Sequence, residues 1–222
     1  MSSNPAAAGN LQVIDIPGRP DPALPTVLAL SLRYNHHWDR RNAELLTPLE
    51  AVLDYVRRGG TAVLCNDFPV PPSPNHIRDL FTSAGLPWVR SAFYRTTFHL
   101  NPAADLVANN ESLLNTLPRT CNMNAVQLLN VAVGDAWYRP NASSGIDTFI
   151  SSLTEAQTEP VENLENTLAA CAKVGLGKLG YVGDVDSEPE SIKIVMAMLG
   201  VHYEEAALPP AWLISMMFPN RE

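Results

Sequence analysis

The chain has 222 residues, of which 46% are hydrophobic, and its 15 basic and 23 acidic residues give a net charge of -8. This length predicts one large domain with a full apolar core. The negative charge, with no basic run longer than two residues, predicts no nucleic-acid groove, because such a groove needs a clustered positive face.

The cysteine pattern and the first residues predict a cytoplasmic protein. The three cysteines are widely spaced and show none of the paired spacings of zinc sites or redox dithiols, so we expect a reduced intracellular protein. Residues 1–10 are small and polar, which predicts a disordered N-terminus without a secretory signal or transit peptide. Because no apolar run approaches the roughly 20 residues that cross a bilayer, we expect no membrane partner.

The first half of the chain predicts alternating strands and helices. A strand pattern at 11–16 precedes a near-continuous apolar run at 26–32, which is typical of strands covered on both faces, as in parallel sheets. Apolar residues at helical spacing over 45–56 predict a helix that ends at Gly59 and Gly60. A buried strand is expected at 61–66.

A short helix at 77–84 and an alternating strand at 93–100 complete the order strand, helix, strand, helix, strand. This order is the pattern of right-handed crossovers in a parallel sheet. We therefore expect one α/β domain over residues 11–207, with a mostly parallel sheet and helices on both faces.

The second half predicts less regular elements. We expect a helix at 106–117, short strands at 125–133 and 136–138, and a hairpin of 171–174 with 179–182. The last helix is predicted to start at Ser187, with Pro189 in its first turn and Glu190 completing a capping box. The apolar segment 208–222 is expected to pack on the core or on a second copy of the chain, as in a homodimer.

Three segments together resemble a known family. They are residues 53–64 with their Arg-Arg-Gly-Gly turn, Leu-Pro-Trp at 86–88 followed by 94–102, and the run at 177–188 that begins Gly-Lys-Leu-Gly-Tyr-Val-Gly-Asp. This set is similar to uncharacterised fungal proteins of the class I glutamine amidotransferase-like, ThuA-like superfamily. The resemblance covers roughly residues 45–200 and implies a flavodoxin-like sheet and a role in fungal secondary metabolism.

The chain departs from that family at the nucleophile. True amidotransferases carry a Gly-x-Cys-x-Gly elbow, whereas this chain reads Cys65-Asn66-Asp67-Phe68-Pro69, so glutaminase activity is not expected. The stretch before residue 45 is also too short for the family's first elements, which implies a shortened sheet or a covering partner subunit. Cys65 is read mainly as a buried structural residue, with a nucleophilic role as the alternative.

Polar residues that follow the predicted strands are the candidate site residues, because the carboxyl ends of parallel strands meet at one edge of a sheet. His36 and His37 follow the first apolar strand, and either could move a proton near neutral pH, with Trp38 contacting substrate; the alternative is a solvated loop. Adjacent histidines seldom face one ligand, so no metal site is expected. Asp67 follows the next strand as a catalytic residue or a loop cap.

A second candidate group lies on the strand at 93–100. Arg95, Thr97 and His99 share one face, where the arginine could hold a carboxylate or oxyanion and the histidine could transfer a proton. Tyr94 is a further substrate-binding candidate. The alternative is an edge strand with one wet face.

A third candidate group follows the last buried strand. Crowding of Asp184, Asp186 and Glu188 would raise their pKa values, making Asp184 a general acid or base and the other two substrate-binding groups. Their spacing is not that of a calcium loop. The structural alternative is that Asp184 binds turn amides while Ser187 and Glu190 cap the helix.

Two function hypotheses follow from these patterns. The first is an enzyme without cofactor or metal, a lyase, isomerase or hydrolase, that acts by acid/base chemistry on a small carbonyl-bearing molecule. The second is a non-catalytic binding or dimeric assembly module on an amidotransferase-like fold that has lost its nucleophile. A hydrolase that uses Cys65 ranks below both.

Overall fold

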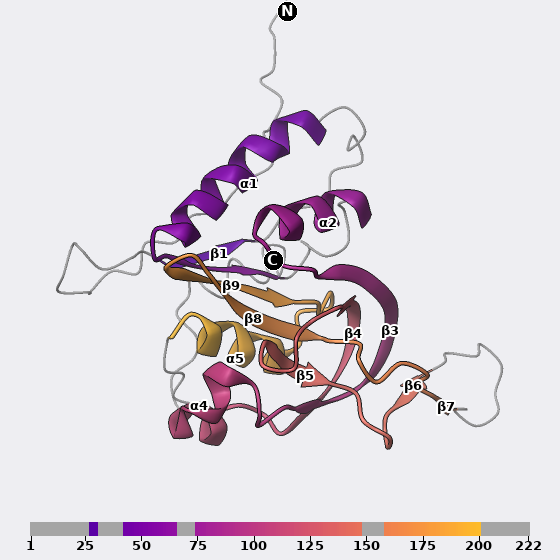
Figure 1. Ribbon diagram of the computed structural model, residues 1–222. Coiled ribbons are helices and arrows are strands. Elements are labelled where there is room, and N and C mark those ends of the chain that lie inside the picture. The colour runs from indigo at the N-terminus through magenta and orange to yellow at the C-terminus, as the bar shows by residue number, and fades with distance from the viewer. Residues whose placement is uncertain (1–26, 31–41, 66–73, 148–157, 201–222) are drawn as a thin grey trace, which may run out of the picture.

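The computed structural model describes residues 27–30, 42–65, 74–147 and 158–200, and within them one mixed sheet organises the fold (Figure 1). Along the sheet the strand order is β1-β2-β9-β8-β5-β3-β6-β7, and β4 pairs with β3. The strands are β1 (Val27–Leu30), β2 (Thr61–Leu64), β3 (Val89–Leu100), β4 (Thr120–Leu129), β5 (Ala136–Arg139), β6 (Gly145–Asp147), β7 (Thr158–Pro160), β8 (Ala169–Val174) and β9 (Gly177–Val182).

Helices lie on both faces of the sheet, with α1 and α2 on one side and α4 and α5 on the other (Figure 1). The described helices are α1 (Asn42–Arg57), α2 (Pro74–Ser83), α3 (Asp105–Ala108), α4 (Glu111–Thr116) and α5 (Pro189–Met198). None of these helices has the length and apolar character needed to span a membrane.

The strand pairing contradicts the predicted flavodoxin-like sheet. Only the pairs β1–β2 and β2–β9 are parallel among the described strands, and the other pairs are antiparallel. The flavodoxin-like and ThuA-like assignment is therefore wrong for this fold. The error came from treating strand-helix-strand order as a series of crossovers, although order along the chain does not specify which strands pair.

Strand β3 shows how the antiparallel part arises. Along this strand Thr96, Phe98 and Leu100 are buried, while Arg95 and Thr97 on the opposite face remain partly exposed. One dry face and one wet face are typical of an antiparallel sheet, whereas parallel strands are covered on both faces. The alternation thus agrees with the alternative interpretation of this strand, in which one of its faces is exposed to solvent.

Two apolar clusters hold the layers together. Between the sheet and α1 with α2, the Phe81 ring packs edge-on against Trp88 at 5.1 Å and Tyr181 at 6.0 Å between centroids. On the other face, α5 buries Ile194 with Trp137 and other sheet residues. Burial of large side chains on both faces is the main stabilising contribution to such a fold.

Several predicted elements differ in detail. The helix expected at 106–117 is two short helices, α3 and α4, and β4 begins at Thr120 rather than at 125. The capping box is wrong: Ser187 has a positive φ of 57°, and α5 is preceded by Glu188, which makes no side-chain cap. Pro189 does lie in the first turn, as predicted. The strand at 11–16, the N-terminus at 1–10 and the segment 208–222 lie outside the described residues.

Candidate functional site

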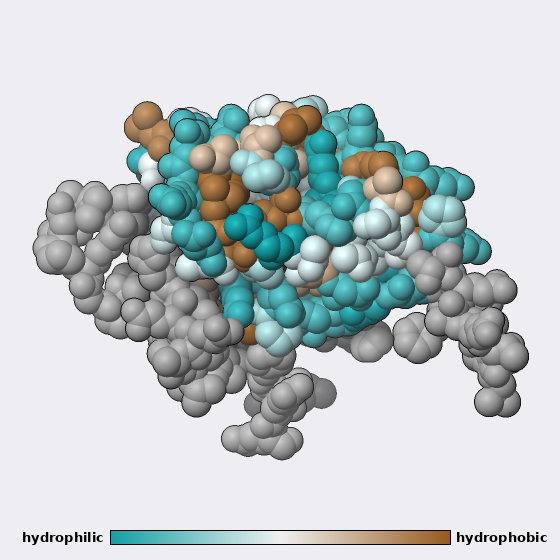
Figure 2. Space-filling view, turned by 90° about the horizontal axis from the view of Figure 1, so that it is seen from below, coloured by the Kyte–Doolittle hydropathy of each residue, from teal (hydrophilic) through white to brown (hydrophobic). Residues whose placement is uncertain are grey.

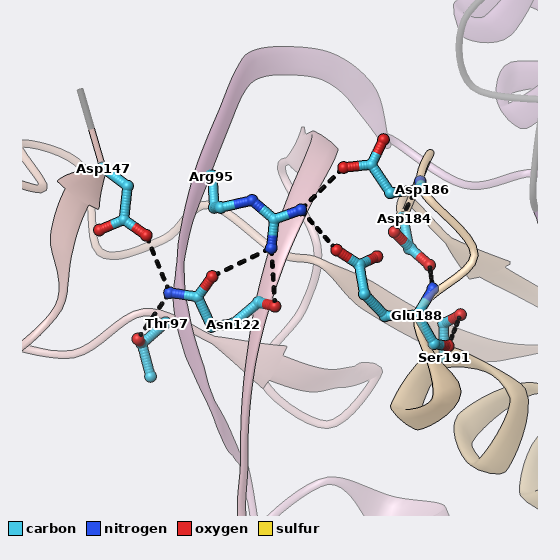
Figure 3. Close-up of polar contacts among 8 residues, drawn as sticks. All are labelled: Arg95, Thr97, Asn122, Asp147, Asp184, Asp186, Glu188 and Ser191. Atoms are coloured by element: carbon cyan, nitrogen blue, oxygen red, sulfur yellow. Dashed lines mark hydrogen bonds and ion pairs between the residues drawn. The ribbon is translucent and has the colours of Figure 1, made fainter. Parts of the chain in front are cut away.

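The structure brings Arg95 of β3 together with Asp186 and Glu188 of the loop between β9 and α5 (Figure 3). Arg95 Nη2 donates to Asp186 Oδ2 at 2.7 Å and to Glu188 Oε1 at 2.6 Å. The loop reaches β3 because Asp184 bridges Ala125 of β4, the strand beside β3. Residues more than 90 positions apart therefore share one ion-paired cluster.

The other side of Arg95 is held by Asn122 of β4. Arg95 Nη1 donates to Asn122 Oδ1 at 3.2 Å and to its carbonyl oxygen at 3.3 Å. Asn122 Nδ2 in turn donates to Thr97 Oγ1 at 3.3 Å and to Asp147 Oδ2 at 3.1 Å. Because both terminal nitrogens of Arg95 bind protein acceptors, the guanidinium serves as a clamp between strands.

Asp184 organises the loop from within. The residue is only 1% exposed, and its two carboxylate oxygens accept the backbone N–H groups of Asp186 at 3.0 Å and Glu188 at 2.9 Å. This confirms the structural interpretation of Asp184 as a residue that binds turn amides. Ser191 of α5 donates its hydroxyl to the Glu188 carbonyl at 2.7 Å and closes the turn.

The carboxyl groups of Asp184 and Glu188 are electrostatically linked. Burial, and then contact with Glu188, raises the pKa of Asp184 to about 7. Burial alone would raise the pKa of Glu188, but the contacts with Asp184 and Arg95 outweigh it and lower that pKa. Glu188 Oε2 is buried without a hydrogen-bond partner, and a proton on Asp184 would supply one. The pair is thus arranged to hold one proton near neutral pH.

Of the other predicted site residues, Tyr94 and His99 are described by the structure, and neither bonds to this cluster. Tyr94 accepts a hydrogen bond from Asn166 Nδ2 at 3.1 Å, and Ser91 donates to Asn166 Oδ1 at 2.9 Å. His99 lies opposite Thr120, and its Nε2 is buried without a hydrogen-bond partner. The predicted residues His36, His37, Trp38 and Asp67 lie outside the described residues.

The three cysteines are buried. Cys65 is 6% exposed, Cys121 4% and Cys171 1%. Burial raises the pKa of Cys171 to about 12 and that of Cys121 above its usual range. A thiolate nucleophile needs a lowered pKa and access to substrate.

We therefore expect native protein to react with iodoacetamide at none of its three cysteines within minutes, because all three are buried. Mass spectrometry should show a group added to every cysteine after the same treatment in about 6 M guanidinium chloride, which unfolds most domains. The denatured sample controls for reagent quality. Rapid modification of Cys65 in native protein would contradict its structural role.

A cavity of about 650 Å³ lies away from the Arg95 cluster, among α3, α4, α5 and the β8–β9 hairpin. Figure 2 views the side on which α4 and α5 lie, where hydrophilic side chains surround smaller hydrophobic areas. The cavity is lined by Trp137 of β5, Lys173 of β8, Lys178 of β9 and Lys193 of α5. Asp105 is the one carboxylate among its described lining residues.

Sequence reasoning missed this cavity because its walls come from separate elements. One signal was present: the chain contains three lysines against twelve arginines, so lysine is used sparingly. Within the described residues, no group of three or more histidine, cysteine, aspartate or glutamate side chains is placed to hold a metal ion.

Comparisons with known proteins give no family. No family model and no curated protein matches the chain. Solved structures with partial likeness include β-galactosidases from Bacillus circulans sp. alkalophilus (13% identity, 69% of this chain and 21% of that chain, TM-score 0.36) and from Rahnella sp. R3 (13%, 68% and 20%, 0.36). A GH42 β-galactosidase, Gan42B, matches at 11% identity over 71% of this chain and 20% of that chain, with a TM-score of 0.33. The chain thus spans about a fifth of each of these proteins, and likeness this low carries no argument about fold or function.

Proposed function

We propose that the protein is a non-catalytic binding module that takes up a small molecule in the cavity among α3, α4, α5 and the β8–β9 hairpin. The observation that carries this proposal is a cavity of about 650 Å³ whose described lining combines the Trp137 side chain with three lysines. Trp137 is 1% exposed and its Nε1 has no hydrogen-bond partner. Because that nitrogen is itself buried, Trp137 offers a ligand in the cavity contacts with its ring rather than a hydrogen bond.

The size and lining of the cavity favour binding over catalysis. Small-molecule sites commonly enclose about 300–1,000 Å³ and combine apolar walls with a few polar groups. Leu106, Leu113 and Met198 provide apolar contacts here, and the described lining includes no histidine or cysteine. The lining therefore combines apolar contacts with a few charged groups, as is usual for a site that holds a small molecule.

The acid/base enzyme remains a prediction from sequence. Its best supporting group is Asp184, whose pKa of about 7 suits proton transfer, but that side chain is buried and occupied by backbone amides. Arg95, its predicted oxyanion anchor, binds the protein's own carboxylates. The dimeric assembly alternative depends on residues 208–222, which are outside the described part of the chain.

Filling the cavity tests the proposal. Ala197 of α5 lines the cavity and is half-buried, so the Ala197→Phe variant should block ligand entry. Ala51→Phe, on an exposed position of α1, is the matched control. We would screen wild-type protein by ligand-observed NMR against sugars, amino acids, carboxylic acids and phosphate esters, and then measure any hit with both variants.

We expect at least one compound to bind wild-type protein and Ala51→Phe, and to lose about tenfold or more in affinity for Ala197→Phe, which corresponds to about 1.4 kcal/mol. Circular dichroism would confirm that both variants fold. The proposal fails if no compound binds, or if hits bind Ala197→Phe as tightly as wild-type protein.

A further inference from the structure

Every lysine of the chain lines the same cavity. The sequence contains three lysines, Lys173, Lys178 and Lys193, and all three are lining residues, whereas the described lining includes no arginine. The β8–β9 hairpin pairs Lys173 with Lys178, and the tertiary structure adds Lys193 of α5. We infer that the cavity binds an anionic group, a phosphate or carboxylate carried by a small molecule, through these lysines.

The placement of Lys173 and Lys178 is unfavourable without an anion. The two residues are direct cross-strand partners in the β8–β9 hairpin, so their side chains leave the same face of the sheet. Like charges directly opposite on a sheet destabilise it. Neither of these two lysines forms an ion pair with a described residue, and Asp105 is the one carboxylate in the described lining. A bound anion would offset this repulsion.

The polar groups at the cavity also match an acceptor-rich ligand. A lysine ammonium donates hydrogen bonds and cannot accept them. Phosphate and carboxylate oxygens are acceptors, and a charged acceptor forms hydrogen bonds about twice as strong as a neutral one.

The whole-protein charge makes this local concentration of cations unusual. The chain carries a net charge of -8, so a lining with three lysines and one described carboxylate differs in sign from the protein as a whole. Lysine provides a compact ammonium on a flexible stem, which suits a small anion approached from several sides. The inference rests on the proposed function, because it assigns a ligand class to that same cavity.

Calorimetric titration of the full-length protein tests the charge class. The anionic probes are inorganic phosphate, glycerol 3-phosphate and citrate, and glucose is the neutral probe, all at constant ionic strength. We expect heat of binding for phosphate-bearing probes, for citrate or for both, which separates phosphate from carboxylate as the preferred group. The Lys173→Gln/Lys178→Gln double variant should weaken anion binding by at least about tenfold, or about 1.4 kcal/mol.

Two controls separate a specific site from general charge effects. Arg78→Gln removes one positive charge from an exposed position of α2 and should leave the affinity unchanged. Because lysine side chains carry almost all of the chain's amines, acetylation by acetic anhydride followed by mass spectrometry reports on the cavity directly. A saturating anion should slow acetylation of Lys173 and Lys178 severalfold.

The outcomes also distinguish this inference from the proposed function. Suppose that neutral compounds bind, that Ala197→Phe blocks their binding, and that the lysine double variant binds them as tightly as wild-type protein does. The anion inference is then wrong, while the proposed binding cavity is supported. If anions bind equally well to the lysine variant and to Ala197→Phe, both are wrong. Thermal unfolding of each variant without ligand excludes misfolding as the cause of lost binding.

Discussion

The stability advantage of wild-type protein over an Asp184→Asn variant should shrink as the pH rises from about 4 to about 7. The pKa of Asp184 lies at about 7 in the folded protein against an ordinary value of 3.8, because the carboxyl is buried beside Glu188. Between these values the folded state holds a proton that the unfolded state has released. The stabilisation from that proton is complete below 3.8 and is lost as the pH rises through 7.

The expected slope follows from the size of the shift. A single group that binds one more proton in the folded state changes the free energy of unfolding by up to about 1.4 kcal/mol per pH unit. The lowered pKa of Glu188 has the opposite effect, but below its ordinary value of 4.5 and therefore mostly outside this window. Arg95 stays charged throughout, because burial lowers its pKa less than the contacts with Glu188 and Asp186 raise it.

Urea unfolding at one-unit steps from about pH 4 to about pH 8 measures this difference. The amide side chain of the Asp184→Asn variant can still accept one backbone N–H but opposes the second with its own donor, so a loss of roughly 1–3 kcal/mol is expected where the proton is present. Asp79→Asn, at an exposed position of α2, is the matched control and should show no such trend. A wild-type advantage that stays constant across this pH range would show that Asp184 titrates normally.

The Gly183→Ala variant should lose about 3 kcal/mol or more in the free energy of unfolding. A Cβ atom at this position would overlap the carbonyl oxygen of Val126 in β4, which is backbone and cannot rotate away. The variant must therefore move the loop after β9 away from β4, where Val126 N–H donates to the Gly183 carbonyl at 2.9 Å. Overpacking costs about 1–3 kcal/mol, and the broken hydrogen bond adds a further contribution of about 1–3 kcal/mol.

Gly134→Ala is the matched control, because a Cβ there meets only the Asp105 carboxylate at 2.8 Å, and this side chain can move. We expect that variant to change stability by less than about 1 kcal/mol, as measured by guanidinium chloride unfolding. The Gly183→Ala variant should also lose the Arg95 cluster, since residue 183 directly precedes Asp184 on the loop. Equal stability of the two alanine variants would show that Gly183 does not lie close against Val126 of β4.

The sequence by itself determined most local elements, because their signals are local. Apolar residues at helical spacing and the glycines Gly59 and Gly85, which have φ values of 112° and 79°, set the ends of α1 and α2. The hairpin of β8 and β9 was likewise predicted from its short glycine turn. The turn-binding role of Asp184 could be anticipated because its partners lie two and four residues away.

Only the tertiary structure decided which strands pair and which side chains meet. The alternation in β3 predicts one solvent-exposed face but does not predict β4 as the antiparallel partner of β3. Strands pair through backbone hydrogen bonds, which are the same for any side chain. The contact of Arg95 with Glu188 joins residues 93 positions apart, and the cavity brings the lysines of the β8–β9 hairpin and α5 together with Trp137 of β5 and Asp105 of α3. Such contacts depend on the path of the whole backbone. The pairing of opposite charges and the burial of side chains that stabilise these contacts exist only once the chain is folded.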